Sequence, residues 1–136
     1  YRMMELKRWK AHLDVELNLE PKFFPANDTT ANLMAVTAGL DGLDVALLSL
    51  VIMRKCWVEE KDVAQDSVLV EAANQCRFDG EALLAASRED RAQEGFDANT
   101  EEASKRQVFG APTYIYKDEV FWGQDRLDFL ERALAN

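Results

Sequence analysis

The residues from Leu43 to Met53 are apolar at almost every position, and charged residues bound this run at both ends. The flanking charges are Asp41, Asp44, Arg54 and Lys55. The run is too short to cross a bilayer, because a membrane-spanning helix takes about 20 residues. A helix that is apolar nearly all the way round has to be covered by other helices. We therefore expect a buried helix over residues 43–57, at the centre of a helical subdomain.

Helix patterns occur on both sides of this run. Asn27 or Asp28 can cap a helix that extends to about residue 38, and Asp66 opens a later helix whose buried face includes Leu69. Asp79 can cap a further helix, which we expect to run from about residue 81 into the nineties. Residues from the twenties to the nineties are therefore predicted to be all-helical.

The end of the chain has a different pattern. The segment Asn99-Thr100-Glu101-Glu102 has the form of a capping box and predicts a short helix to about Arg106. Two β-rich runs come next, Thr113–Tyr116 and Val120–Trp122, and their short separation predicts a hairpin. A closing helix then carries three leucines on one face: Leu127, Leu130 and Leu134.

The beginning of the chain predicts one helix and one strand. Residues 3–13 place their apolar side chains on one arc, as an amphipathic helix does. Val15, Leu17 and Leu19 alternate with polar residues, which is the period of a short half-buried strand. The segment from Glu20 to Pro25 has two prolines and two phenylalanines and predicts an extended loop with an apolar surface.

This order of elements predicts an α/β sandwich interrupted by a helical subdomain. We expect residues 1–21 and 98–136 to build the sheet part and residues 22–97 to form the helical insertion. Only three strands are visible, and the chain enters its first helix at Tyr1 with no cap residue ahead of it. We therefore expect that an amino-terminal segment, which would supply further strands, is missing from this sequence.

The charge of the chain disfavours nucleic-acid binding. Its 25 acidic residues exceed its 16 basic residues, so the formal net charge is −9. A nucleic-acid strand would be repelled by most of such a surface. We accordingly expect neither a nucleic-acid partner nor a membrane partner.

Cys56 and Cys76 form no C-x-x-C pair, and one histidine does not complete a zinc site with them. We expect two reduced, partly buried thiols in a cytoplasmic protein, and no metal. The single histidine, His12, lies at the polar end of a predicted helix. We expect it to be exposed and not to act as a base.

Two segments near the end of the chain point to a family. Val108-Phe109-Gly110-Ala111-Pro112-Thr113 precedes the first hairpin strand, and Phe121-Trp122-Gly123-Gln124-Asp125-Arg126-Leu127 joins the second strand to the closing helix. With the Pro21–Pro25 loop, they resemble the family of 2-hydroxychromene-2-carboxylate isomerases and kappa-class glutathione transferases, relatives of the DsbA-like oxidoreductases. The resemblance covers essentially the whole chain. It implies an α/β, thioredoxin-like fold with an inserted all-helical subdomain, whose first strand-helix-strand unit is absent from this chain.

The resemblance implies that glutathione is the cofactor. The backbone of Ala111 would pair with the cysteinyl part of the peptide, beside a cis bond to Pro112; a trans proline opening an edge strand is the alternative. Gln124 and Asp125 would hold the γ-glutamyl end at a helix amino terminus. From the residues alone, Asp125 is better explained as an acid that favours the start of a helix, and only the resemblance reverses this preference.

Asn99, Trp122 and Phe24 are candidates for the pocket of an aromatic substrate. Each also has a structural interpretation, because Asn99 can cap a helix and the two aromatic residues can be core. The family places its catalytic serine after the first strand and a lysine just before the helix that begins at Tyr1. Neither position exists in this sequence, so we expect no catalytic residue in this chain.

Three functions remain as hypotheses. The complete protein is expected to be a glutathione-dependent isomerase of an aromatic-degradation intermediate such as 2-hydroxychromene-2-carboxylate, in which the thiolate adds to the substrate, permits bond rotation and leaves. A kappa-like glutathione transferase or a DsbA-like disulfide oxidoreductase keeps the fold and changes the reaction. A non-catalytic binding module is the third. The resemblance also implies a homodimer.

Overall fold

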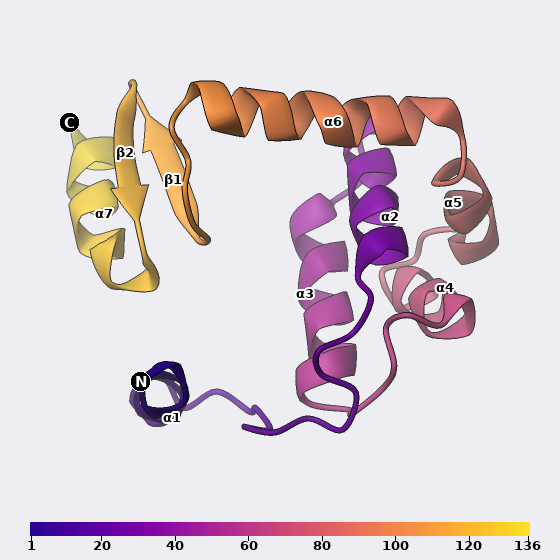
Figure 1. The fold of residues 1–136 in the computed structure, drawn as a ribbon, viewed down its shortest axis with the longest axis horizontal. Coiled ribbons are helices and arrows are strands. Elements are labelled where there is room, and N and C mark those ends of the chain that lie inside the picture. The colour runs from indigo at the N-terminus through magenta and orange to yellow at the C-terminus, as the bar shows by residue number, and fades with distance from the viewer. The chain divides into compact units, whose positions relative to one another are not determined.

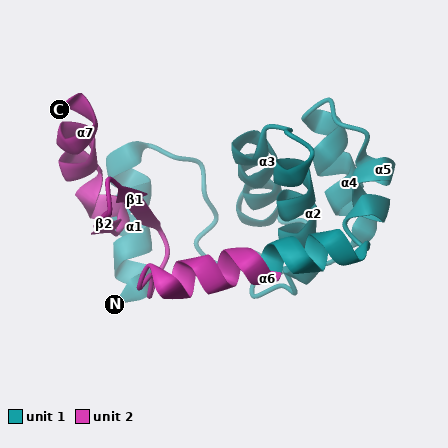
Figure 2. Cartoon of the chain, turned by 90° about the horizontal axis from the view of Figure 1, so that it is seen from above, with its two compact units in different colours: residues 1–96 teal, residues 97–136 magenta.

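The computed structural model describes all 136 residues and divides into two compact units, residues 1–96 and 97–136 (Figure 2). The first unit is helical, and the second contains the only sheet. Helix α6 begins in the first unit and ends in the second. The elements of the first unit (Figure 1) are α1 (Arg2–Leu13), α2 (Thr29–Leu40), α3 (Val45–Trp57), α4 (Asp66–Gln75), α5 (Gly80–Ala86) and the start of α6 (Asp90–Lys105).

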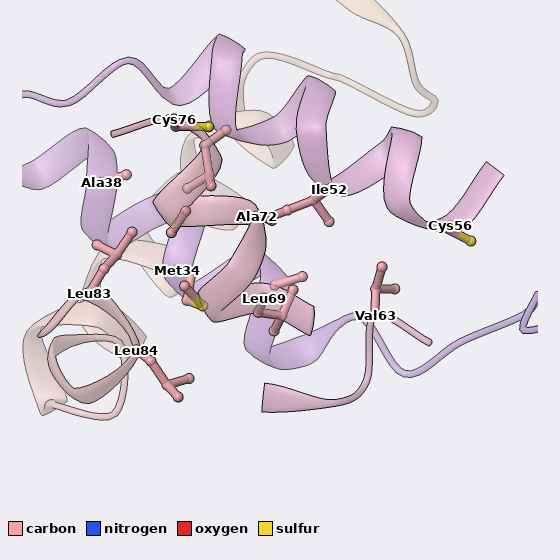
Figure 3. Close-up of a cluster of buried hydrophobic side chains, with 13 residues drawn as sticks. Met34, Ala38, Ile52, Cys56, Val63, Leu69, Ala72, Cys76, Leu83 and Leu84 are labelled. Carbon is pink, nitrogen blue, oxygen red and sulfur yellow. The ribbon is translucent and has the colours of Figure 1, made fainter. Parts of the chain in front are cut away.

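The core of the first unit lies where α2, α3, α4 and α5 pack against one another. Met34 of α2, Leu48 of α3 and Leu69 of α4 are fully buried at its centre, and Figure 3 shows two of them among their neighbours. Leu83 and Leu84 of α5 complete the cluster. Burying each leucine contributes roughly 2 kcal/mol. The prediction that residues from the twenties to the nineties are helical is therefore confirmed, and these helices share a core of their own.

Aspartates start two of these helices. Asp44 Oδ1 accepts a hydrogen bond of 2.9 Å from the N–H of Leu47, and Asp79 Oδ1 accepts one of 3.0 Å from Ala82. At α2 the sequence left Asn27 and Asp28 as alternative caps, and in the structure each residue has part of that role. Asp28 occupies the cap position without a side-chain bond, while Asn27 Oδ1 accepts from the N–H of Thr29 at 3.0 Å. The carboxylate of Asp28 is thus left free of its own helix.

The prediction that other helices surround α3 is wrong. One side of the helix is buried through Leu48 and Ile52, but Leu47, Leu50 and Met53 are 40, 53 and 54% exposed. Hydropathy predicted the helix correctly, yet it cannot tell how many neighbours a helix has. The first unit therefore presents an apolar helix face to solvent.

The helix boundaries after Asp79 also differ from the prediction. Helix α5 ends at Ala86, where the Ser87 hydroxyl donates to the carbonyl of Leu84 at 2.7 Å, and α6 runs unbroken from Asp90 to Lys105. Asn99 thus lies in the middle of α6 and caps nothing. The capping-box prediction failed because packing holds α6 helical before Asn99: Ala92 is fully buried, and a Cβ on Gly95 would lie only 2.9 Å from Val36.

Residues 15–19 are not a strand, contrary to the prediction. The only sheet is the two-stranded β1–β2 hairpin, so this segment has no neighbouring strand to pair with. It is fixed instead by single bonds: the Asn18 N–H donates to the carbonyl of Trp57 at 2.8 Å, and Lys10 Nζ donates to the carbonyl of Leu17 at 2.5 Å. An alternating pattern forms a strand only beside a partner.

The second unit is built on a hairpin. Strand β1 (Thr113–Tyr116) pairs antiparallel with β2 (Glu119–Trp122), with Thr113 opposite Trp122. Lys117 and Asp118 both have positive φ, 48° and 64°, as the tight two-residue turn of a hairpin requires. A short 3₁₀ turn, η1 (Gln124–Arg126), leads into α7 (Leu127–Ala135), which packs against both strands. The predicted hairpin and closing helix are confirmed.

A buried cation joins two helices of the first unit. Lys55 of α3 has a fully buried side chain, and its Nζ donates to Glu71 of α4 at 2.7 Å and to Glu59 at 2.9 Å. Burial lowers the pKa of Lys55, but the two carboxylates outweigh it and leave that pKa raised. The hydrogen bond from Lys55 also holds the pKa of Glu71 below its ordinary value. The bond to Glu71 links α4 to α3, and the bond to Glu59 links the end of α3 to the residues that follow it.

We predict that Leu69→Ala lowers the free energy of unfolding by about 2–5 kcal/mol, because it leaves a cavity at a fully buried site. Urea unfolding followed by circular dichroism measures this change. Leu50→Ala, on the exposed face of α3, is the matched control and should change stability by less than about 1 kcal/mol. Equal losses in the two variants would mean that Leu69 is not in a packed core.

We also predict that Lys55→Met flattens the pH dependence of stability. The lowered pKa of Glu71 stabilises the fold above pH 4.5, and this contribution is lost as the pH falls through the folded value. The raised pKa of Lys55 stabilises the fold below pH 10.5 and is lost as the pH rises past it. Melting temperatures across this range should therefore vary less in Lys55→Met than in the parent. Lys7→Met removes an exposed cation and should leave the profile unchanged.

Candidate functional site

The loop before β1 and the turn after β2 are joined by the backbone. The Ala111–Pro112 peptide bond is cis, as predicted, and so is the Phe24–Pro25 bond, which was not predicted. The N–H of Gly123 donates to the carbonyl of Pro112 at 2.9 Å, so it extends the hairpin ladder by one bond. Through this bond, the segment that begins at Gly123 lies next to the proline loop.

Gly123 is required at its position. Its φ of 107° lies in the region that side chains rarely adopt, and a Cβ there would approach Asp125 Oδ1 to 2.6 Å. This conformation turns the chain out of β2 and into the η1 turn. The glycine therefore determines where Gln124 and Asp125 are presented.

Gln124 and Asp125 are both exposed in the η1 turn. Their backbone N–H groups donate to no backbone acceptor, as is usual for the first residues of a helical turn. Arg126 Nη1 contacts the Asp125 carboxylate at 2.8 Å and also donates to the Asp125 carbonyl at 3.1 Å. The turn thus offers a carboxylate held by a neighbouring arginine and two free N–H donors.

Ala111 offers unpaired backbone groups beside this turn. Its N–H and carbonyl take part in no backbone hydrogen bond, and both Ala111 and Pro112 are exposed. The loop itself is fixed, because the Thr113 hydroxyl donates to the carbonyl of Gly110. An extended peptide could pair with Ala111 as an added strand does.

Aromatic side chains lie over the same loop. Trp122, at the end of β2, is 52% exposed, and a Cβ on Gly110 would lie 2.5 Å from its indole Nε1. Phe109 packs on Trp122 with ring centroids 5.0 Å apart and is 74% exposed. No sequence pattern had assigned Phe109 a role. The sequence does contain a feature that could have indicated this stacking: Gly110, next to Phe109, has no side chain and so lets Trp122 approach the loop closely.

Phe24 lies in the first unit and lines a pocket there. Its ring packs on Trp57 at a centroid distance of 4.6 Å, and both rings border a cavity of about 290 Å³ between α2 and α3. Asn99 is exposed on α6. The structure therefore brings Ala111, Gln124 and Asp125 together at one end of the hairpin. Phe24 belongs to the other unit, and no contact joins Asn99 to these three residues.

The two cysteines and the single histidine all lie in the first unit. Cys56 and Cys76 are free and buried, and burial raises the pKa of both thiols. Figure 3 shows them at different ends of the buried cluster. His12 is exposed, as predicted, with its ring 5.5 Å from that of Trp9. The side chains include no group of three or more potential metal ligands, and none of the helices has the length and hydropathy to span a membrane.

Residues 1–135 match the family of DSBA-like thioredoxin domains. The chain belongs to this family. Its two-stranded sheet, proline loop and closing helix are accordingly part of a thioredoxin-like DsbA fold, and the helical cluster is the insertion that the sequence predicted.

The similar proteins share one name. A 2-hydroxychromene-2-carboxylate isomerase of Sphingobium xenophagum is 31% identical over 98% of this chain and 67% of its own length. One from Pseudomonas putida is 29% identical over 99% of this chain and 64% of its own. A solved structure of a 2-hydroxychromene-2-carboxylate isomerase superposes with a TM-score of 0.81 at 28% identity, covering 99% of this chain and 64% of that one. The chain thus spans about two thirds of the length of its relatives.

We predict that Gly123→Ala disrupts the junction between the hairpin and the η1 turn, because the new Cβ collides with Asp125. The amide proton of residue 123 should lose its protection from hydrogen exchange, with a local cost of roughly 1–3 kcal/mol. Gly42→Ala is the matched control, since Gly42 also has positive φ but nothing lies within 4 Å of its Cβ position. Gly42→Ala should leave exchange in the hairpin unchanged; protection retained in Gly123→Ala would contradict the assigned geometry.

Proposed function

We propose that this chain is part of a glutathione-dependent isomerase acting on an aromatic-degradation intermediate of the 2-hydroxychromene-2-carboxylate type. The family match and the names of the relatives support an isomerase. The observation that carries the glutathione site is the backbone bond between Gly123 and Pro112, because it places a peptide-pairing edge beside a turn with a carboxylate and free N–H groups.

The residues of this chain fit the two ends of such a peptide. In the proposed complex, the N–H and carbonyl of Ala111 pair with the cysteinyl unit as a short antiparallel strand. The N–H groups of Gln124 and Asp125 bind the γ-glutamyl carboxylate, and the Asp125 side chain pairs with the ammonium group. In this complex Arg126 keeps its contact with the Asp125 carboxylate and limits the orientations of that side chain.

Glutathione, when bound, supplies the sulfur nucleophile that adds to the substrate and later leaves. The part played by this chain is to bind and orient it, since the family places its catalytic serine in a segment outside these residues. Trp122 and Phe109 provide an exposed aromatic surface beside the loop, against which a ring of the substrate can stack. In this proposal the hairpin orients glutathione, and the rest of the protein activates its thiol.

The proposal predicts that Asp125→Asn weakens glutathione binding about fivefold, because it removes one half-exposed ion pair with the ammonium group. Calorimetric titration with glutathione measures this loss. Asp118→Asn is the matched control: it removes the same charge from the hairpin turn, outside the site, and should bind like the parent. If both variants bound glutathione equally weakly, the loss would come from the change in net charge and not from the site. If the parent chain did not bind glutathione, the result would favour a non-catalytic module.

A DsbA-like disulfide oxidoreductase is the second candidate, and the family match is what favours it. The cysteines of this chain do not provide its chemistry. A redox-active thiol is partly exposed and has a lowered pKa, whereas burial raises the pKa of Cys56 and Cys76. In this case the redox pair would belong to the segment outside these residues, as would the serine of a kappa-like transferase.

The proposal extends to the state of the whole protein. By resemblance, we propose a homodimer in the cytoplasm. Sedimentation equilibrium of the full-length protein measures its mass in solution and should give the mass of two protomers. The mass of one protomer at micromolar concentration would contradict the dimer.

A further inference from the structure

The cavity between α2 and α3 is lined only by residues of the first unit, and none of them is among the residues proposed to bind glutathione. Its floor consists of buried side chains, Ala31, Ile52, Cys56 and Val63, each of which is less than 10% exposed. Its rim includes Phe24 and Met53, two large apolar side chains that are both 54% exposed. A ligand in the cavity would remove this apolar rim from water.

The cavity suits an aromatic ring better than an aliphatic chain. Phe24 and Trp57 meet at an interplanar angle of 44°, and a third ring can join such a pair edge-to-face. Cys56 and Met53 bring two sulfur atoms to the same wall, and sulfur favours contact with ring edges. The volume of about 290 Å³ is ample for one or two fused rings, since a cavity of roughly 150 Å³ holds benzene.

The polar groups of the cavity determine the charge of its ligand. Asp28 is the only charged residue in its lining, and Asn32 and Ser49 are the only other polar ones. The Asp28 side chain makes no capping hydrogen bond to α2, so its carboxylate can accept a hydrogen bond from a ligand. The same carboxylate repels an anion.

We propose that this cavity binds a neutral one- or two-ring aromatic molecule that carries a hydrogen-bond donor, with the ring between Phe24, Trp57 and Met53 and the donor on Asp28. This ligand class excludes aromatic carboxylates, which are the substrates named for the relatives. The cavity is therefore an aromatic site whose specificity differs, by the charge of the ligand, from that for these carboxylates.

Indole and indole-2-carboxylate test this specificity, because they share one ring system and differ by a negative charge. Calorimetric titration of the 136-residue chain, without glutathione, should show saturable binding of indole and binding of the carboxylate at least about fivefold weaker. Asp28→Asn should bring the two affinities to within about twofold. Equal affinities in the parent chain, or no saturable binding of indole, would overturn the proposal.

The position of the site is tested by filling it. Ala35 lines the cavity and is half-buried, so Ala35→Leu should weaken indole binding at least about tenfold. Ala46→Leu is the matched control, because Ala46 is exposed on α3 and lies outside the lining. Undiminished binding in a folded Ala35→Leu variant would place the ligand elsewhere and overturn the proposal.

The unmodified chain provides a test that needs no variant. Cys56 lines the cavity and Cys76 does not, although both thiols are buried. Saturating indole should slow the alkylation of Cys56 by a maleimide at least about threefold, because alkylation then requires the ligand to leave. The alkylation rate of Cys76 should stay unchanged. Equal rates at Cys56 with and without indole would overturn the proposed position even if Ala35→Leu failed to fold.

Discussion

The first unit depends on one packing constraint: three long side chains from three helices have to be buried in one cluster. Met34, Leu48 and Leu69 are all fully buried there. None of these helices could bury its apolar side alone, because an isolated helix of this length is marginal in water. The cluster therefore orders α2, α3 and α4 together, and the bond from Lys55 to Glu71 fixes the position of α4 on α3, while Glu59 provides the second carboxylate of the buried cation. A buried cation with two carboxylates tolerates little sliding.

The second unit depends on local pairing, and this is why the sequence predicted so much of it. The β-rich runs, the two-residue turn and the glycine after Trp122 are all within a few residues of one another. Adjacent strands need no distant partner, so the hairpin, the cis bond at Pro112 and the position of Gln124 and Asp125 beside it could be inferred from patterns and resemblance. The failures lie elsewhere. Residues 15–19 have a strand pattern but no partner, and Asn99 has a cap pattern inside a helix that Gly95 and Ala92 pack against its neighbours.

The α2–α3 cavity illustrates a different limit of sequence reasoning. Phe24 was a candidate pocket residue from its loop alone, but its partners come from α3, more than one helix away along the chain. No periodicity indicates that α3 leaves one face uncovered, because its sequence is apolar on every side. Whether such a helix is enclosed or exposed depends on how many helices pack on it, which is a property of the tertiary structure.

This exposure links the packing of the first unit to its chemistry. If α3 were surrounded, as its hydropathy predicts, Met53 and Trp57 would be core residues and the cavity would be filled. Because the covering helices stop short of this side, Met53 stays 54% exposed and Cys56 lies at the floor of an open site. An apolar pocket that opens at the edge of a well-packed core, with the carboxylate of Asp28 in its lining, has the composition expected of the binding site that we propose.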